Sequence, residues 1–174
     1  MIQLSVIMWT FSMFFAFIGF QRGWNKEIIA TSGIILALFA LHQFDTFLRE
    51  ILLGNLSAEQ RFLLQTLFFV IVIYFAYQTR AVIGGRGGDG RDSLQESVLG
   101  GIIGFVNGYL VWGSIWYFLD INGYPAGLNV IPPTNQAEVV QMLPLYLLAG
   151  GPQGPGDLLS LIVIVLFLIV LIVI

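Results

Sequence analysis

The sequence predicts an all-α membrane protein, a helical bundle of four to five transmembrane helices. Of its 174 residues, 57% are hydrophobic and only 10% are charged, whereas a soluble domain carries about 25% charged residues. Its long apolar runs approach or reach the length that crosses about 30 Å of hydrocarbon at about 1.5 Å per residue. The net charge of -3 and the seven basic residues argue against nucleic acid as a partner. The lipid bilayer is therefore the expected surrounding.

The first two predicted helices cover residues 2–20 and 28–44. The first has neither a basic segment before it nor a small-x-small cleavage site after it, so we expect a retained spanning helix rather than a signal peptide. Between them, Gly19–Glu27 reverses the chain, because glycine adopts backbone angles that are closed to other residues. Small residues recur three and four apart on both helices, at Ser12, Ala16, Gly19 and Gly23 and at Ala30, Gly33, Ala37 and Ala40. Such stripes predict an antiparallel hairpin packed along these two faces.

The third and fourth helices are predicted over about 62–83 and 98–119. Ser57 with Gln60, and Ser93 with Glu96, have the spacing of capping boxes that would open them. Between the two helices, residues 84–91 form a glycine-rich polar link that we expect to be flexible. Its G-x-G-x-x-G pattern is not interpreted as a dinucleotide site, because it follows a spanning helix and no βαβ unit is present.

The fourth predicted helix carries glycines at every fourth residue, Gly100, Gly104 and Gly108. Each glycine costs an aqueous helix about 1 kcal/mol relative to alanine, so their period calls for close contact with another helix. We expect the partner to be the first hairpin, through Ala16 and Gly19 or through Gly33 and Ala37. Asn107 is the polar residue within this glycine face, and an interhelical hydrogen bond is its favoured role over a substrate contact.

Two blocks of this sequence resemble the colicin V production protein (CvpA) family. The first is the Arg22-Gly23 turn followed by Glu27, and the second is the helix Leu99-Gly100-x-x-x-Gly104-x-x-x-Gly108. The resemblance covers about residues 2–120. It implies a bacterial inner-membrane protein associated with production or secretion of a small toxin, or with envelope maintenance. Glu96, Ser97 and Asn107 stand where the family pattern has an Asp-Arg pair and an arginine, which puts in doubt any role that needs charge there.

The remainder of the chain is predicted as a loop and a last helix. All six prolines lie between residues 120 and 157, and proline blocks regular helix continuation. We therefore divide the chain into a CvpA-like four-helix region (1–120), a Pro/Gly-rich extracytoplasmic loop (121–157) and a C-terminal transmembrane helix (158–174). Within the loop, residues 137–148 are apolar enough for a short interfacial helix interrupted by Pro144.

The basic residues predict the orientation of a multi-pass protein of the cytoplasmic membrane. Cytoplasmic loops carry an excess of lysine and arginine. The first and third loops hold Arg22, Lys26, Arg80, Arg86 and Arg91, whereas the long loop holds none. We therefore expect the N-terminus and the Pro-rich loop outside and the C-terminus inside.

Few residues suggest chemistry. Arg22 and Glu27 could clamp the first hairpin as an ion pair or line an ion path, and the clamp is favoured because the pair lies at the membrane edge. His42 is the single histidine; it could ligate a haem or chlorophyll metal, but an interfacial residue bonded to a neighbour such as Gln43 or to water is favoured. The fifteen Phe and four Trp leave contact with a pigment or quinone open, although aromatics commonly fill helix interfaces.

These observations lead to one leading function and two alternatives. No Ser-His-Asp set, metal cluster or pair of carboxylates can be assembled, so we expect neither an enzyme nor a bound cofactor or metal. The leading hypothesis is a CvpA-type membrane protein that acts by packing its helices against other transmembrane subunits. One alternative is an accessory subunit of a large bioenergetic or photosynthetic complex. The other is a small channel or transporter.

Overall fold

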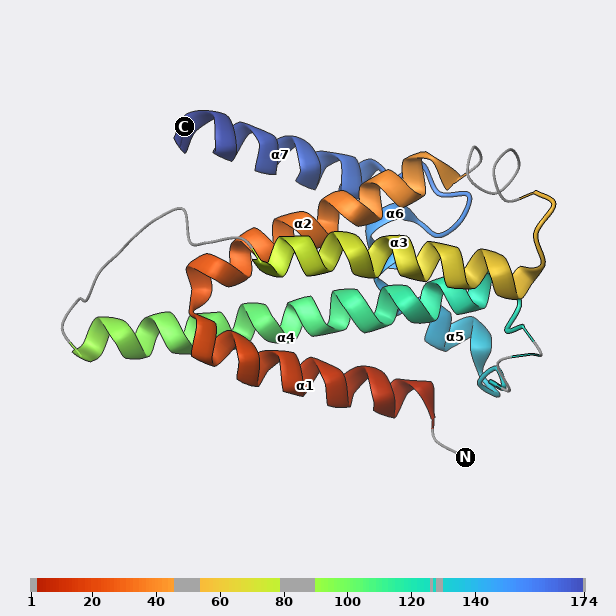
Figure 1. The fold of residues 1–174 in the computed structure, drawn as a ribbon, viewed down its shortest axis with the longest axis horizontal. Helices are drawn as coiled ribbons and strands as arrows, with labels where there is room; N and C mark the ends of the chain where they lie inside the picture. Colours follow the sequence, from red (N-terminus) through yellow and green to blue (C-terminus); the bar gives the residue numbers. More distant parts are fainter. Residues whose placement is uncertain (1–2, 46–53, 79–89, 126, 128–129, 174) are drawn as a thin grey trace. The chain divides into compact units, whose positions relative to one another are not determined.

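The computed structural model describes residues 3–45, 54–78, 90–125, 127 and 130–173. Every regular element among them is helical (Figure 1). The seven helices are α1 (Leu4–Arg22), α2 (Trp24–Gln43), α3 (Ala58–Gln78), α4 (Gly90–Ile121), α5 (Gln136–Val140), α6 (Pro144–Ala149) and α7 (Asp157–Val173). The predicted all-α fold is confirmed.

Among the described residues, four helices are long and apolar enough to cross a membrane: α1, α2, α3 and the Leu94–Ile121 part of α4. The apolar stretch described in α7, Asp157–Leu168, is shorter. Four candidate spans agree with the predicted bundle of four to five helices, and the chain is a multi-pass membrane protein. At about 1.5 Å per residue, the 32 residues of α4 exceed what one crossing requires.

The chain divides into two compact units. Unit 1 comprises Met1–Ile34 and Val72–Gly113, and unit 2 comprises Ile35–Ile71 and Ser114–Ile174. The divisions fall inside α2, α3 and α4, so each unit holds one part of each of these helices. Unit 1 also contains α1, and unit 2 contains α5, α6 and α7.

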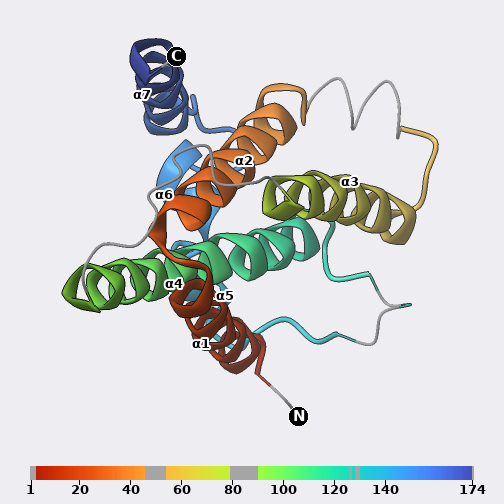
Figure 2. The same cartoon turned by 60° about the vertical axis from the view of Figure 1, so that its left-hand side comes forward.

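Unit 1 is built on contact between α1 and the glycines of α4. The two helices lie alongside each other (Figures 1 and 2). A Cβ on Gly104 would collide with the carbonyl oxygen of Phe15, and one on Gly108 would lie 2.6 Å from the Cα of Ser12. Gly19 and Gly100 exclude side chains from each other in the same way. The backbones therefore approach to a distance that only glycine permits.

The small residues of the first two helices do not pack against each other as predicted. Gly19 on α1 faces Gly100 and Gly104 of α4, whereas a Cβ on Gly33 of α2 would meet the side chain of Ala76 on α3. The predicted hairpin packing along these two stripes is therefore wrong. A small-residue stripe shows which face of a helix admits a close neighbour, and here each stripe receives a helix that is distant in sequence.

Unit 2 has a core of large apolar side chains. Phe69 of α3 and Phe118 of α4 are fully buried, with ring centroids 5.4 Å apart in an edge-to-face contact. Leu143, Leu145 and Leu159 are also fully buried. They bring the segment after α4 into the same core, although sequence analysis placed most of that segment in a loop.

Of the two predicted capping boxes, one begins a helix and the other does not. The Ser57/Gln60 capping box is confirmed: the Ser57 amide donates to the Gln60 side chain at 3.0 Å, and the Gln60 amide to Ser57 Oγ at 3.3 Å. The second capping box is wrong, because α4 begins at Gly90 and includes both Ser93 and Glu96. Gly90 and Arg91 are thus helical rather than part of the predicted link. The other residues of that link lie outside the described part of the chain. So do residues 79–83, at the predicted end of the third helix.

Pro144 follows the interruption predicted within residues 137–148, since α5 ends at Val140 and α6 begins at Pro144. It occupies the first position of α6, where the N–H that proline lacks would have no partner within the helix. Between α6 and α7 the chain turns through Gly150, Gly151 and Gly156, all with positive φ. The amide of Gly156 donates to the carbonyl of Ala149 at 3.1 Å, which closes this turn.

Candidate functional site

The candidate site in unit 1 is centred on Glu27, in the first turn of α2. Its exposed fraction is 0%, and among the described residues it is the one buried side chain that carries a charge. The first turn favours a carboxylate because unpaired backbone N–H groups give this end of a helix a partial positive charge. That stabilisation alone does not offset removal of the carboxylate from water, which costs several kcal/mol. Glu27 therefore needs specific partners.

Arg22, the last residue of α1, is the counter-ion. Its Nη1 lies 2.5 Å from Glu27 Oε1, and its Nη2 donates to the backbone carbonyl of Tyr77 at 3.0 Å. The centre of the guanidinium lies 4.4 Å from the centroid of the Tyr77 ring, within the range of a cation–π interaction. About 20% of the Arg22 side chain is exposed. The pair thus joins a buried carboxylate to a partly exposed cation.

The second carboxylate oxygen of Glu27 is held by two further helices. Oε2 accepts hydrogen bonds from the Tyr77 hydroxyl of α3 at 3.2 Å and from Asn107 Nδ2 of α4 at 2.8 Å. The same Asn107 nitrogen lies 3.2 Å from the backbone carbonyl of Glu27. Thr31 Oγ1 lies 2.6 Å from Asn107 Oδ1 and 2.8 Å from the Glu27 carbonyl. We call these five residues, from α1, α2, α3 and α4, the Glu27 cluster.

The arrangement is suited to joining helices. Both oxygens of the carboxylate have donors, and the one positive and one negative charge balance. Hydrogen bonds to an ionised group are roughly twice as strong as those between neutral groups. A carboxylate buried between spanning helices is also the kind of group that ion and proton paths use. The geometry therefore favours a cluster that holds the four helices together over a path for ions or protons.

The glycines of α4 place Asn107 within reach of Glu27. Asn107 lies between Gly104 and Gly108, whose contacts bring the α4 backbone against α1. Larger residues at these two positions would move α4 away from α1, and the 2.8 Å hydrogen bond from Asn107 would be stretched. Glycine packing and the Glu27 cluster are thus parts of one structure.

The structure brings most of the predicted site residues into two groups. Arg22, Glu27 and Asn107 meet in the Glu27 cluster. The α1–α4 contact holds Gly19, Gly23, Gly100, Gly104 and Gly108, together with the backbone of Ala16, which faces Gly101. Gly33 lies against Ala76 instead, and Ala37 is buried within unit 2.

Sequence analysis missed Thr31 and Tyr77 as members of the cluster. Thr31 lies four residues after Glu27, and therefore on the same helical face, which was an available signal. Tyr77 was not among the predicted site residues. Its contact with Glu27 spans 50 residues of sequence, and no local pattern indicates it.

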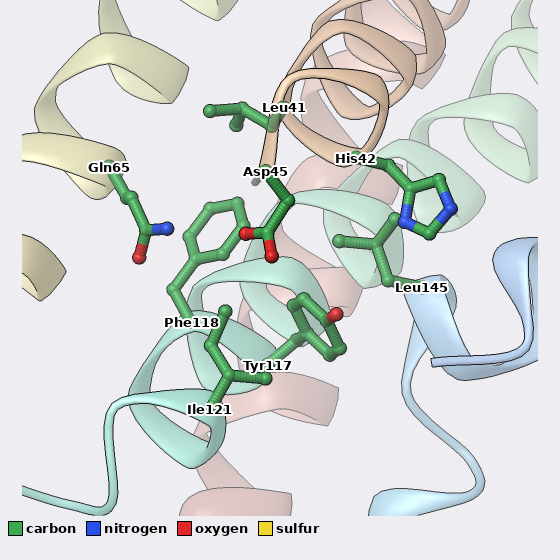
Figure 3. Close-up of a pocket in the computed structure, with 8 residues that line it drawn as sticks. All are labelled: Leu41, His42, Asp45, Gln65, Tyr117, Phe118, Ile121 and Leu145. Carbon is green, nitrogen blue, oxygen red and sulfur yellow. The ribbon is translucent and has the colours of Figure 1, made fainter. Parts of the chain in front are cut away.

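His42 belongs to unit 2 and borders a small cavity (Figure 3). The cavity is lined by Leu41, His42, Asp45, Gln65, Tyr117, Phe118, Ile121 and Leu145. It has a volume of about 10 Å³. That is about the room of one water molecule, which is too small for a haem, chlorophyll or quinone.

The ring of His42 is held by the turn before α7. Nε2 lies 3.2 Å from the carbonyl oxygen of Gly154, and because a carbonyl only accepts, this nitrogen must carry the proton. A Cβ on Gly156 would lie 2.9 Å from the same ring. The partner of His42 is thus a backbone group 112 residues away, rather than Gln43. Among the described residues no group of three His, Cys, Asp or Glu side chains could hold a metal ion.

Beyond the end of α4, burial raises the pKa of Tyr124 to about 12, with the Asp120 carboxylate contributing in the same direction. Trp116 Nε1 donates to the Tyr124 hydroxyl at 3.0 Å. The pKa of Tyr146 is raised for the same two reasons. Both phenols are therefore neutral at physiological pH.

Comparison with known proteins identifies the family. The family model described as Colicin V production protein matches residues 4–144, which include the whole Glu27 cluster and the glycine helix. No curated protein and no solved structure matches the chain. The match confirms the resemblance seen in the Arg22-Gly23 turn and the glycine helix, and it extends beyond residue 120 into the proline-rich segment. This multi-pass membrane protein belongs to the Colicin V production protein family.

Proposed function

We propose that this protein is a non-enzymatic scaffold of the bacterial inner membrane. In this role it supports the production or secretion of a small toxin, or the maintenance of the envelope, by packing its helices against other transmembrane proteins. The link to toxin production follows from the name of its family. The partners and the mode of action are parts of the proposal.

The observation that carries the proposal is the Glu27 cluster. Glu27, Arg22 and Asn107 bind one another inside unit 1, and both oxygens of the carboxylate accept hydrogen bonds from side chains of the same unit. Chemistry on a bound molecule would need polar groups that are free to reach it. A buried carboxylate bonded to side chains of α1, α3 and α4 supports a structural role.

The decisive experiment is native electrophoresis of the tagged chain from membranes solubilised in a mild detergent. We expect the chain to migrate with other membrane proteins. Gly104→Leu, which separates α4 from α1, should abolish this co-migration together with toxin export. Ile102→Leu is the matched control, because Ile102 is exposed on the same helix. Migration of the wild type alone, without heavy partners, would refute the scaffold proposal and also the reading as an accessory subunit.

A second candidate function, a small channel or transporter, is favoured by the burial of Glu27 between spanning helices. Its test is ion or proton flux in vesicles that contain the purified protein. Flux that Asn107→Leu abolishes, while the variant remains folded, would support transport. Absence of flux from the folded wild type would count against it.

A further inference from the structure

The guanidinium of Arg22 has hydrogen-bonding capacity that its known contacts do not use. Arginine carries five N–H donors. Among the described residues, Nη1 donates to Glu27 and Nη2 donates to the carbonyl of Tyr77. Three N–H groups have no acceptor within the described part of the chain, on a side chain that is 20% exposed.

Arg22 is also held in a fixed orientation. The Glu27 carboxylate, the Tyr77 carbonyl and the face of the Tyr77 ring contact it from separate directions. A side chain that is already immobilised loses little conformational entropy when a ligand binds. Its unused donors are therefore preorganised, unlike those of a freely moving surface arginine.

The position of Arg22 indicates which ligand can reach it. Arg22 ends α1 and Trp24 begins α2, and both helices are candidate spans, so the turn that joins them lies at the membrane surface. The groups next to this turn include lipid phosphates. Planar guanidinium donors match the oxygens of a phosphate in a bidentate geometry.

Lys26 supplies the net charge. Glu27 neutralises Arg22, but Lys26 is exposed in the first turn of α2, next to the same turn of the chain. A basic residue near an anionic membrane surface contributes about 1 kcal/mol of attraction. We propose that Arg22 and Lys26 together bind the phosphate of an anionic phospholipid headgroup at the α1–α2 turn.

The test measures lipid retained by the full-length protein. The protein is purified in an uncharged detergent and mixed with equal amounts of phosphatidylglycerol and phosphatidylcholine, and the lipids that remain bound are counted by native mass spectrometry. We expect preferential retention of phosphatidylglycerol. Arg22→Lys, which keeps the charge but loses the planar donors, and Lys26→Gln should each reduce it about fivefold. Arg61→Gln, which removes a basic residue from the start of α3, is the matched control and should leave it within about twofold.

Adding inorganic phosphate distinguishes a site that binds any phosphate group from a site that binds the whole lipid headgroup. Displacement of the lipid by millimolar phosphate would support a site that recognises the phosphate group itself, while resistance together with sensitivity to both variants would support recognition of the whole headgroup. Retention unchanged by Lys26→Gln would overturn the proposal even if Arg22→Lys fails to fold, because Lys26 is exposed. An equal loss in Arg61→Gln would overturn it as well, since the attraction would then be non-specific.

Discussion

Two glycines of α4, three residues apart, allow the α1–α4 contact to be tested without changing anything else about the helix. A Cβ at Gly104 would collide with the backbone oxygen of Phe15 and lie 3.0 Å from the Cα of Gly19. At Gly101 the nearest atom to a new Cβ is the carbonyl oxygen of Ala16 at 3.4 Å, an ordinary contact. Replacing each with alanine adds the same methyl group to the same helix, so the two variants differ mainly in sterics.

The expected magnitudes follow from this difference. Both replacements gain up to about 1 kcal/mol because alanine forms helices more readily than glycine. Gly104→Ala must also push backbone against backbone, and overpacking of this kind costs typically about 1–3 kcal/mol. Gly101→Ala should therefore be as stable as the wild type or more stable, and Gly104→Ala should be less stable than Gly101→Ala by about 1–3 kcal/mol.

The assay is equilibrium unfolding of the purified protein in mixed micelles, followed by tryptophan fluorescence. Equal stability of the two variants would refute the close approach of α1 and α4 at Gly104. A lower stability of Gly101→Ala would show that α1 approaches α4 more closely at Gly101 than at Gly104. An intermolecular contact would be revealed if the effect of Gly104→Ala disappeared on dilution.

Three further predictions concern other contacts. Arg22→Leu should lower the free energy of unfolding by about 3 kcal/mol, because it leaves the Glu27 carboxylate buried without a counter-ion. Arg22→Leu combined with Glu27→Leu should recover most of this loss in the same unfolding assay. A double variant as unstable as the single one would contradict the pairing. Gly156→Ala should destabilise unit 2 by about 1 kcal/mol or more, because Gly156 has positive φ and faces the His42 ring; unchanged thermal unfolding would contradict that contact. The raised pKa of Tyr124 means that folding favours its neutral phenol, so this stabilisation is complete below pH 10 and is lost as the pH rises to about 12. Unfolding measured across this range should show a loss that is smaller in Tyr124→Phe, and an identical profile in the variant would contradict the assignment.

The class of protein, and the features that depend on neighbouring residues, could be predicted from the amino-acid sequence. Apolar runs predict spanning helices because length and composition alone decide whether a segment can cross hydrocarbon. The Ser57/Gln60 capping box was predictable because both partners lie within one helical turn. The four-residue period of Gly100, Gly104 and Gly108 identified the face of α4 that a neighbour approaches, because helix geometry converts spacing into direction.

Which helices contact one another could not be predicted and became evident from the packed fold. Spacing along one helix does not say which other helix lies against it, and two small-residue stripes were available as partners for α4; the structure brings Gly19 to α4 and Gly33 to Ala76 of α3. Glu27 is likewise separated from Tyr77 by 50 residues and from Asn107 by 80. Hydrogen bonds over such separations form only after packing has placed the helices, because side chains reach only a few ångströms from their own backbone. The ion pair could therefore be predicted from the sequence, whereas the complete burial of Glu27 and its two additional donors, Tyr77 and Asn107, could not.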